Sequence, residues 1–253
     1  MIGKRRRLGR ILRNGRTVIV PMDHGITKPE AGLENIDSLI GLIENYVDAV
    51  VLHKGVVKSS EILQNSDVAL IIHLSASTKL GKPENKKLVT SVEKAIALGA
   101  DGVSVHVNIG AENEGEQLEK LGLISEICDS YGMPLLVMGY PKGERNLNTV
   151  KHAARVAYEL GADIVKVPFV EEMDEVVEYA KIPVVIAGGG KTAEADFFRM
   201  VEKALICGAA GVAAGRNVFQ SENPTRVVRT LHKIVHEGVK FEEVVSYVEG
   251  SDR

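Results

Sequence analysis

A lysine inside an apolar segment is the first candidate for chemistry in this sequence. Lys166 lies in the run Ile-Val-Lys-Val at residues 164–167, between Gly161 and Pro168. Such a run is typical of a buried parallel strand, and burial that disfavours the charged amine makes it a nucleophile toward a carbonyl. The alternative is a strand-end lysine whose stem carries the amine out to solvent. The run alone leaves both interpretations open.

Two glycine-rich segments are candidates for binding a phosphate. One is Gly-Gly-Gly-Lys-Thr at residues 188–192, and the other begins with Gly215 and Arg216. Glycines allow backbone N–H groups to approach an anion, and Lys191 or Arg216 would add positive charge. The alternative for the first segment is a tight turn without a ligand.

Polar residues follow most of the other apolar runs. They are Asp23, His24, His53, Lys54, His73, His106, Asn108 and Tyr140. An iminium on Lys166 would draw electrons from a carbon–carbon bond two atoms away, and that step needs groups that move protons, such as Tyr140 and Asp23. Lys54 is a candidate for the second cation that favours an unprotonated Lys166. The alternatives are that Asp23 caps a turn and that Tyr140 covers an opening.

The histidines allow a different class of chemistry. The alternative is that His24, His53, His73 and His106 converge on a metal ion that polarises a carbonyl. The sequence lacks the carboxylate ligands and the His-x-His spacing that are typical of metal sites in barrels. We therefore expect neutral histidines that hydrogen-bond substrate or backbone, with no metal and no cofactor.

The repeating pattern of the chain predicts how these residues are positioned. Eight strand-like runs occur at residues 17–20, 49–52, 69–72, 102–107, 134–138, 164–167, 183–187 and 211–214. Segments with helical spacing separate them, and several end in Gly-Ala, which suits a left-handed helix end. Eight β-then-α units predict an α/β fold, a closed (β/α)8 TIM barrel that forms a single domain over residues 1–253. An open doubly wound sheet is the alternative, but no Gly-x-Gly-x-x-Gly follows the first run.

A barrel of this kind would gather the candidate residues at one end. Active sites of β/α barrels form at the C-terminal ends of the strands, and phosphate commonly binds the loops after strands seven and eight. The segments that begin at Gly188 and Gly215 follow the seventh and eighth runs. Both ends of the chain add helical segments: a short amphipathic helix at the N-terminus and an extra helix at residues 241–248.

Composition limits the classes of partner. The chain has 253 residues, a net charge of −3, 45% hydrophobic and 26% charged residues. This charge argues against nucleic acid, and we expect the basic residues at 4–13, with Leu8, Ile11 and Leu12, to pack under the fold. No apolar run is long enough to cross a membrane. Cys128 and Cys207 fall in helical segments, so we expect no disulfide framework and a cytoplasmic protein.

Six segments together resemble the archaeal class I aldolase family. They are residues 20–25, 52–55, 138–143, 162–166, 187–192 and 215–220, within a resemblance that spans about residues 9 to 235. The resemblance implies a (β/α)8 barrel, a Schiff base on Lys166, Tyr140 as proton donor and Asp23 as acid/base partner. It implies substrate or phosphate contacts from His24, Gly25, Ile26, Thr27, His53, Lys54, Pro141, Lys142, Gly188, Gly189, Gly215 and Arg216.

The same resemblance implies an activity. The family contains fructose-1,6-bisphosphate aldolases and 2-amino-3,7-dideoxy-D-threo-hept-6-ulosonate synthases, and the histidine-rich segments at 53–55, 73–75 and 106–110 are more similar to the synthases. The implied reaction is a transaldolase step that moves a three-carbon ketone unit from 6-deoxy-5-ketofructose 1-phosphate to L-aspartate semialdehyde. It belongs to early aromatic amino acid biosynthesis, through 3-dehydroquinate. The partners expected are a small sugar phosphate, an aldehyde acceptor and copies of the same chain in a homo-oligomer, such as a decamer.

Two other functions stay open. One is a class I fructose-1,6-bisphosphate aldolase. The other is a catalytically inactive paralogue that binds sugar phosphates, because residues 167–172, Gly190 and Lys142 depart from the family's usual pattern. Lys142 replaces an arginine and so removes a planar, two-pronged donor.

Overall fold

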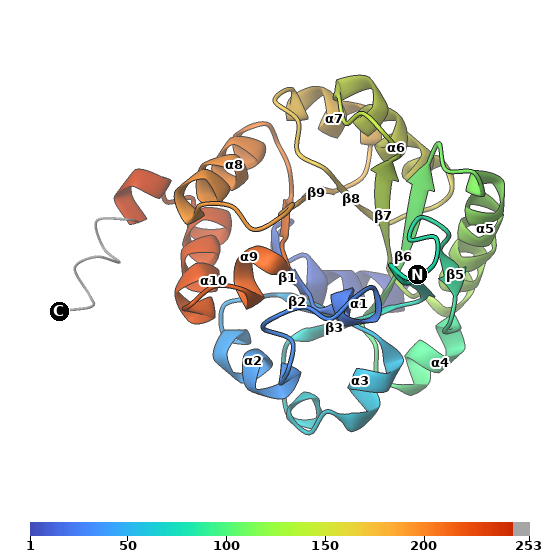
Figure 1. Cartoon of the computed structure of the whole chain (residues 1–253), viewed down its shortest axis with the longest axis horizontal. Helices are drawn as coiled ribbons and strands as arrows, with labels where there is room; N and C mark the ends of the chain where they lie inside the picture. The colour runs from blue at the N-terminus through green and yellow to red at the C-terminus, as the bar shows by residue number, and fades with distance from the viewer. Residues whose placement is uncertain (245–253) are drawn as a thin grey trace.

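The computed structural model describes residues 1–244, and its centre is a closed barrel of parallel strands (Figure 1). The strands are β1 (Thr17–Pro21), β2 (Ala49–Leu52), β3 (Ala69–His73), β6 (Gly102–Ile109), β7 (Leu135–Pro141), β8 (Ile164–Val167), β9 (Val184–Ala187) and β10 (Gly211–Ala213). Their order around the barrel is β1-β10-β9-β8-β7-β6-β3-β2. The prediction of a (β/α)8 barrel is confirmed, and the eight predicted runs match these strands with small differences at their ends.

Helices surround the barrel on its outer side. They are α2 (Ile36–Ile43), α3 (Lys54–Ser59), α4 (Val92–Ala97), α5 (Glu114–Tyr131), α6 (Leu147–Glu159), α7 (Met173–Ala180), α8 (Glu194–Ile206), α9 (Arg216–Phe219) and α10 (Pro224–His232). Two 3-10 helices, η1 (Asp23–Ile26) and η2 (Ile62–Gln64), and a short π-helix, η3 (Lys233–Glu237), also occur among the described residues. Gly99, Gly161 and Gly208 follow α4, α6 and α8 with φ of 82°, 87° and 93°, the left-handed conformation that was predicted from the Gly-Ala pattern.

Alternation along the strands divides the apolar residues between two cores. On β8, for example, Val165 and Val167 belong to the core between strands and helices, whereas Ile164 belongs to the cluster inside the barrel. Successive side chains of a strand point to opposite faces, so each strand contributes to both cores. This rule decides which polar residues reach the barrel interior.

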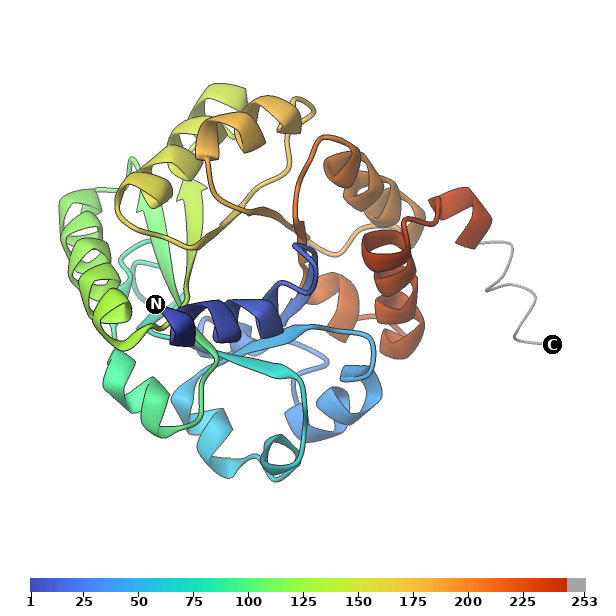
Figure 2. The ribbon, with the colours of Figure 1, turned by 180° about the vertical axis from the view of Figure 1, so that it is seen from behind.

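Helix α1 (Ile2–Ile11) covers the N-terminal end of the barrel (Figure 2). Ile11 is 1% exposed and packs with the cluster inside the barrel, together with Leu8 and Leu12. The predicted amphipathic helix under the fold is confirmed. The open end of the barrel therefore lies at the C-terminal ends of the strands.

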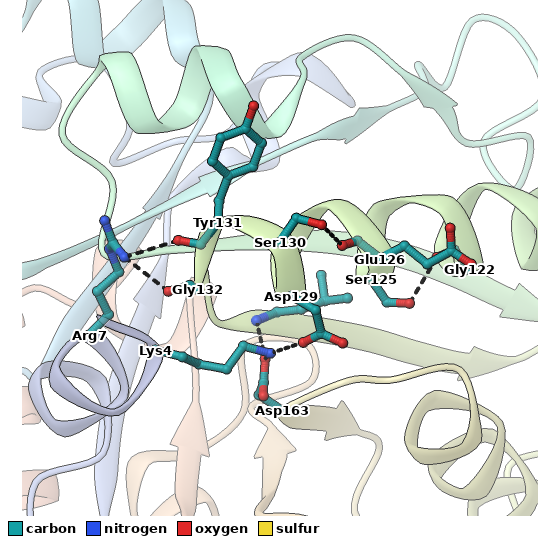
Figure 3. A network of polar contacts seen from close by, with 11 residues as sticks. Lys4, Arg7, Gly122, Ser125, Glu126, Asp129, Ser130, Tyr131, Gly132 and Asp163 are labelled. Carbon is teal, nitrogen blue, oxygen red and sulfur yellow. Dashed lines mark hydrogen bonds and ion pairs between the residues drawn. The ribbon is translucent and has the colours of Figure 1, made fainter. Parts of the chain in front are cut away.

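The basic residues of this N-terminal segment pair with aspartates that precede strands. The pairs are Lys4–Asp163 at 2.9 Å, Arg10–Asp101 at 3.1 Å and Arg13–Asp48 at 3.2 Å. Each aspartate also accepts a backbone N–H from the neighbouring strand, as Asp163 does from Leu135 at 2.9 Å. Figure 3 shows Lys4 between Asp163 and Asp129, and Arg7 donating to the carbonyl of Gly132. The basic cluster thus fixes α1 to the barrel.

Two features lie outside the predicted pattern. A short antiparallel hairpin, β4 (Ser75–Ala76) with β5 (Lys87–Leu88), follows β3 and was not predicted. The predicted C-terminal helix at residues 241–248 is helical at 241–244, and its remaining residues lie outside the described part of the chain. Among the described residues, no helix has both the length and the apolar character that crossing a membrane requires.

Candidate active site

Lys166 points into the barrel near its open end. It is two residues from Ile164, which faces the barrel interior, and it pairs in register with the inward-facing Met138. The residue is 6% exposed. Its amine is therefore enclosed by the barrel and does not reach out to solvent.

The same alternation brings the other candidate residues into one layer. Tyr140 follows the inward-facing Leu136 and Met138 on β7, and His73 follows the inward-facing Ala69 and Ile71 on β3. A cavity of about 660 Å³ opens above this layer. The predicted residues that line it are Asp23, His24, Ile26, Thr27, His53, His73, His106, Asn108, Tyr140, Pro141, Lys142, Lys166, Gly188, Gly189, Gly215 and Arg216.

Three predicted residues lie outside the cavity lining. Lys191 is exposed, and its ammonium donates a hydrogen bond to the carbonyl of Gln220. Gly25 is an exposed residue of η1, between the lining residues His24 and Ile26. Lys54 is the first residue of α3, its side chain is exposed, and its ammonium donates a hydrogen bond to the carbonyl of Val89. The inward row of β2 ends at His53, so the next residue turns away from the barrel axis.

Asp23 is held ionised by its surroundings. Its carboxylate lies 3.7 Å from Nδ1 of His24 and 3.8 Å from Nε2 of His73. Burial would raise the pKa of Asp23, but electrostatic interactions with the neighbouring His73, His24 and Lys166 outweigh it and hold the pKa well below its usual range. Asp23 is thus suited to accept a proton from a substrate hydroxyl.

The imidazoles of the cavity are held neutral. Burial lowers the pKa of His73 to about 4, although Asp23 opposes the shift. Burial also lowers the pKa of His24, His53 and His106, the last well below its ordinary value. Neutral imidazoles hydrogen-bond without adding charge to the cavity.

A hydrogen-bond network fixes the histidine side of the cavity. Nδ1 of His73 lies 2.7 Å from the Ser104 hydroxyl, and its Nε2 lies 3.2 Å from the hydroxyl of Ser75. The ring of His106 stacks on Tyr140 with centroids 4.9 Å apart, and its Nε2 lies 3.0 Å from Oδ1 of Asn108. The ring of Tyr140 is therefore held at the wall of the cavity beside Lys166.

The glycines of the two phosphate-binding candidates permit close packing. A Cβ on Gly188 would lie 2.7 Å from Cβ of Ala214, and one on Gly215 would lie 2.6 Å from the carbonyl oxygen of Pro21. The amide of Asn217 joins the two loops, donating to the carbonyl of Gly188 at 2.6 Å and accepting from the N–H of Thr192 at 3.0 Å. The loops after β9 and β10 thus form one cradle.

Several buried polar atoms around the cavity have no hydrogen-bond partner among the described residues. They are Oδ1 of Asp23, Nδ1 of His24, Nε2 of His53 and Nε of Arg216. Leaving such groups unpaired is costly, so a ligand that bonds to them would be stabilised. These atoms belong to residues that line the cavity from Arg216 to His53. In the described part of the chain, no three His, Cys, Asp or Glu side chains are arranged to hold a metal ion.

Comparison with known proteins decides the family. A model of the DeoC/LacD family aldolases matches residues 17–221. The chain belongs to the DeoC/LacD family of aldolases. This aldolase is 60% identical to 2-amino-3,7-dideoxy-D-threo-hept-6-ulosonate synthase 1 of Archaeoglobus fulgidus, over 98% of this chain and 96% of the relative.

Two further relatives place the aldolase in its family. It is 42% identical to 2-amino-4,5-dihydroxy-6-oxo-7-(phosphonooxy)heptanoate synthase of Streptomyces griseus, over 87% of this chain and 85% of the relative. It is similar to the structure of an archaeal fructose-1,6-bisphosphate aldolase whose catalytic lysine is covalently bound to a carbinolamine intermediate. That structure has a TM-score of 0.81 and 32% identity, over 92% of this chain and 99% of the other.

Sequence analysis did not single out four polar residues that line this aldolase's cavity, Ser77, Glu84, Lys86 and Arg145. Glu84 and Lys86 line the wall between β3 and β6, and Asn217 joins the glycine loops. Asn217 was visible as the polar residue after Gly215 and Arg216, but nothing in the sequence indicated its direction. Glu84 and Lys86 lie in a segment without periodicity, so only the hairpin reveals their position.

Proposed function

We propose that this aldolase is a Schiff-base transaldolase of the 2-amino-3,7-dideoxy-D-threo-hept-6-ulosonate synthase type. The observation that carries the proposal is the amine of Lys166, enclosed in the barrel and facing the ionised Asp23 across a cavity that Tyr140 also lines. The 60% identity to a synthase of that name supports the substrate class. The donor is then 6-deoxy-5-ketofructose 1-phosphate and the acceptor L-aspartate semialdehyde.

In the first half of the reaction, the amine of Lys166 adds to the methyl ketone of the donor and water leaves. Asp23 accepts the proton of the hydroxyl on the carbon that becomes an aldehyde. The carbon–carbon bond breaks, its electrons reach the iminium nitrogen, and a three-carbon enamine stays on Lys166. The phosphorylated three-carbon fragment departs as an aldehyde.

The second half reverses the bond change with a different aldehyde. The enamine carbon attacks the aldehyde of L-aspartate semialdehyde, and the oxygen that becomes a hydroxyl takes a proton from Tyr140 or from protonated Asp23. Water then releases the product and restores the amine. The cradle of Gly188, Gly189, Gly215 and Arg216 is the proposed site for the donor phosphate, because it offers backbone N–H groups and an unpaired guanidinium Nε.

Borohydride trapping tests the proposal. Wild type and Lys166→Met are incubated separately with 6-deoxy-5-ketofructose 1-phosphate and with fructose 1,6-bisphosphate, reduced, and mapped by peptide mass spectrometry. We expect an adduct on Lys166 and heptulosonate product from the deoxy sugar with wild type only. Lys94→Met, which removes an exposed lysine of α4, is the matched control and should keep both signals.

Other outcomes would assign the protein differently. Cleavage of fructose 1,6-bisphosphate without use of aspartate semialdehyde would favour the aldolase activity, which the 32% identity to structures of that enzyme makes the second candidate. Binding of a sugar phosphate without any adduct would indicate a binding protein that has lost catalysis. Near-full turnover by Lys166→Met would exclude the imine mechanism.

The setting of the enzyme is part of the same proposal. We infer a cytoplasmic enzyme without a metal or cofactor that assembles as a closed homo-oligomer, such as a decamer. Family resemblance supports this assembly. Light scattering coupled to size-exclusion chromatography measures the subunit number, and a monomer at micromolar concentration would contradict it.

A further inference from the structure

The cavity wall opposite the glycine cradle carries two charges that the proposed reaction has not used. Glu84 and Lys86 both line the cavity, in the segment that leads into β5. In the barrel order, β3 and β6 lie four places from β9 and β10. The segment follows β3 and is bonded to Asn108 of β6, so it faces the cradle across the barrel.

Amide side chains hold this segment in place. The carbonyl of Glu84 accepts hydrogen bonds from Asn108 at 2.9 Å and from Gln117 at 3.0 Å. Asn113 donates to the side-chain oxygen of Asn85 at 2.6 Å, and Gln117 is buried. Charges presented by residues 84–86 are thus held in fixed positions, as a recognition site requires.

Lys86 differs from the other lysines of its segment. Lys82 and Lys87 form ion pairs with Glu112 at 2.9 Å and Glu116 at 2.7 Å. The ammonium of Lys86 has no hydrogen-bond or ion-pair partner among the described residues, and burial lowers its pKa, an effect that Asp23 opposes. A cation in such a position gains stability when an anion binds beside it. Glu84 is only loosely paired, with Nζ of Lys142 at 3.8 Å.

We propose that Lys86 and Glu84 form the subsite for the amino-acid end of the acceptor, with Lys86 binding its α-carboxylate and Glu84 its α-ammonium. This inference rests on the proposed function and deepens it. The acceptor carries an ammonium and a carboxylate on the same carbon. Glu84 and Lys86, two residues apart, offer the opposite charge for each of them. The glycine cradle and Arg216 offer donors and positive charge, which suit a phosphate but repel an ammonium.

The subsite explains how one lysine handles two different partners. The incoming aldehyde bonds to the same enamine carbon from which the phosphorylated fragment departed. The enzyme therefore distinguishes the two aldehydes by the group at their other end, a phosphate in one and an amino-acid group in the other. Anchoring the acceptor on the β3–β6 wall leaves the phosphate cradle free for the donor. No bond changes at Lys86 or Glu84, which only orient the acceptor.

Acceptor kinetics test this assignment with three aldehydes and three variants. L-aspartate semialdehyde has both charges, succinate semialdehyde lacks the ammonium, and propanal lacks both. Lys86→Met should raise KM for the first two aldehydes by roughly tenfold to a hundredfold, the usual effect of losing a charged hydrogen bond. Glu84→Gln should raise KM for L-aspartate semialdehyde alone, and neither variant should affect propanal. Lys82→Met, the matched control on the same segment, should behave as wild type with all three.

Binding of an unreactive analogue separates this inference from the proposed reaction. L-homoserine carries the same amino-acid end with an alcohol in place of the aldehyde. Calorimetry should detect binding of L-homoserine to wild type and Lys82→Met. Its affinity for Lys86→Met should be at least tenfold lower. If wild type binds L-homoserine through Lys86 but makes no heptulosonate, the subsite stands and the proposed reaction fails.

Two results would overturn the subsite. One is equal weakening of all three aldehydes by Lys86→Met, which would indicate a general structural role. The other is a normal KM in Lys86→Met together with a raised KM for L-aspartate semialdehyde in Arg216→Met, which would place the carboxylate in the glycine cradle. Full trapping of the donor on Lys166 in the Lys86, Glu84 and Lys82 variants shows that the first half of the reaction is intact.

Discussion

At the scale of single residues, the cavity combines the ionised Asp23 with neutral imidazoles. His73 is 3% exposed and lies between Asp23, His53, Lys86 and Lys166. Because it is buried as a neutral ring, protonation of His73 in the folded state is disfavoured. The same arrangement that keeps Asp23 ionised therefore makes the barrel sensitive to acid.

We expect His73 to make the free energy of unfolding decrease as the pH is lowered. The pKa of His73 is about 4 in the folded state, below its ordinary value of 6.5, so between these values the unfolded chain binds more protons. The contribution of His73 to the free energy of unfolding is fully present above about pH 6.5 and is lost toward pH 4. Between pH 7 and pH 5 this loss is about 2 kcal/mol. Asp23 adds nothing in that window, since its pKa is lowered from 3.8.

Urea unfolding of wild type and His73→Asn at pH 7 and pH 5 measures the effect. The variant should lose about 2 kcal/mol less stability between the two pH values than wild type does. It should keep part of the dependence, because burial also lowers the pKa of His24, His53 and His106. Identical pH dependence in both proteins would show that folding does not lower the pKa of His73.

At the scale of elements, strand periodicity was enough to place the catalytic candidates but not the walls around them. Lys166 and Tyr140 lie in apolar runs, so alternation places both side chains inside once the barrel is closed. Lys54 lies one residue beyond the inward row of β2, and so outside the cavity lining. Glu84, Lys86 and Asn217 depend on contacts between segments distant in sequence, which no local pattern records.

The attachment of α1 allows a matched test of two aspartates that bind the same lysine. Lys4 lies 2.6 Å from Asp129, whose side chain is 68% exposed, and 2.9 Å from Asp163, whose side chain is 17% exposed. Asp163→Ala also leaves the N–H of Leu135 without its partner. We expect Asp163→Ala to lower the free energy of unfolding by about 2 to 3 kcal/mol and Asp129→Ala by less than about 1 kcal/mol.

Chemical denaturation with a donor-trapping assay checks this prediction. Both variants should keep the adduct on Lys166, because the aspartates lie at the end of the barrel away from the cavity. Equal losses of stability in the two variants would mean that exposure does not govern the strength of these pairs. Loss of the adduct without loss of stability would contradict the separation of the two ends.

At the scale of the whole molecule, closing the barrel depends on the seam between β1 and β10. Gly211 pairs in register with Thr17, and a Cβ on Gly211 would lie 1.9 Å from the carbonyl oxygen of Thr17. Its φ of 154° also disfavours other residues. A side chain there would force the first and last strands apart.

We therefore expect Gly211→Ala to lower the free energy of unfolding by roughly 3 kcal/mol or more, or to abolish folding. Gly122→Ala on α5 is the control, since no atom lies within 4 Å of its added Cβ, and it should stabilise the protein by about 0.5 to 1 kcal/mol. Thermal unfolding and the yield of folded protein measure both. A Gly211→Ala variant as stable as wild type would show that β1 and β10 can separate without cost.

Because α1 closes the N-terminal end of the barrel, it limits the route by which substrates enter and products leave. With Ile11 packed into the interior, molecules enter and leave the cavity through the same mouth. The phosphorylated aldehyde must then clear the mouth before the second aldehyde reaches the enamine. Initial rates should show double-displacement kinetics, with parallel reciprocal plots. The departing aldehyde should compete with L-aspartate semialdehyde for the nucleophilic enamine on Lys166.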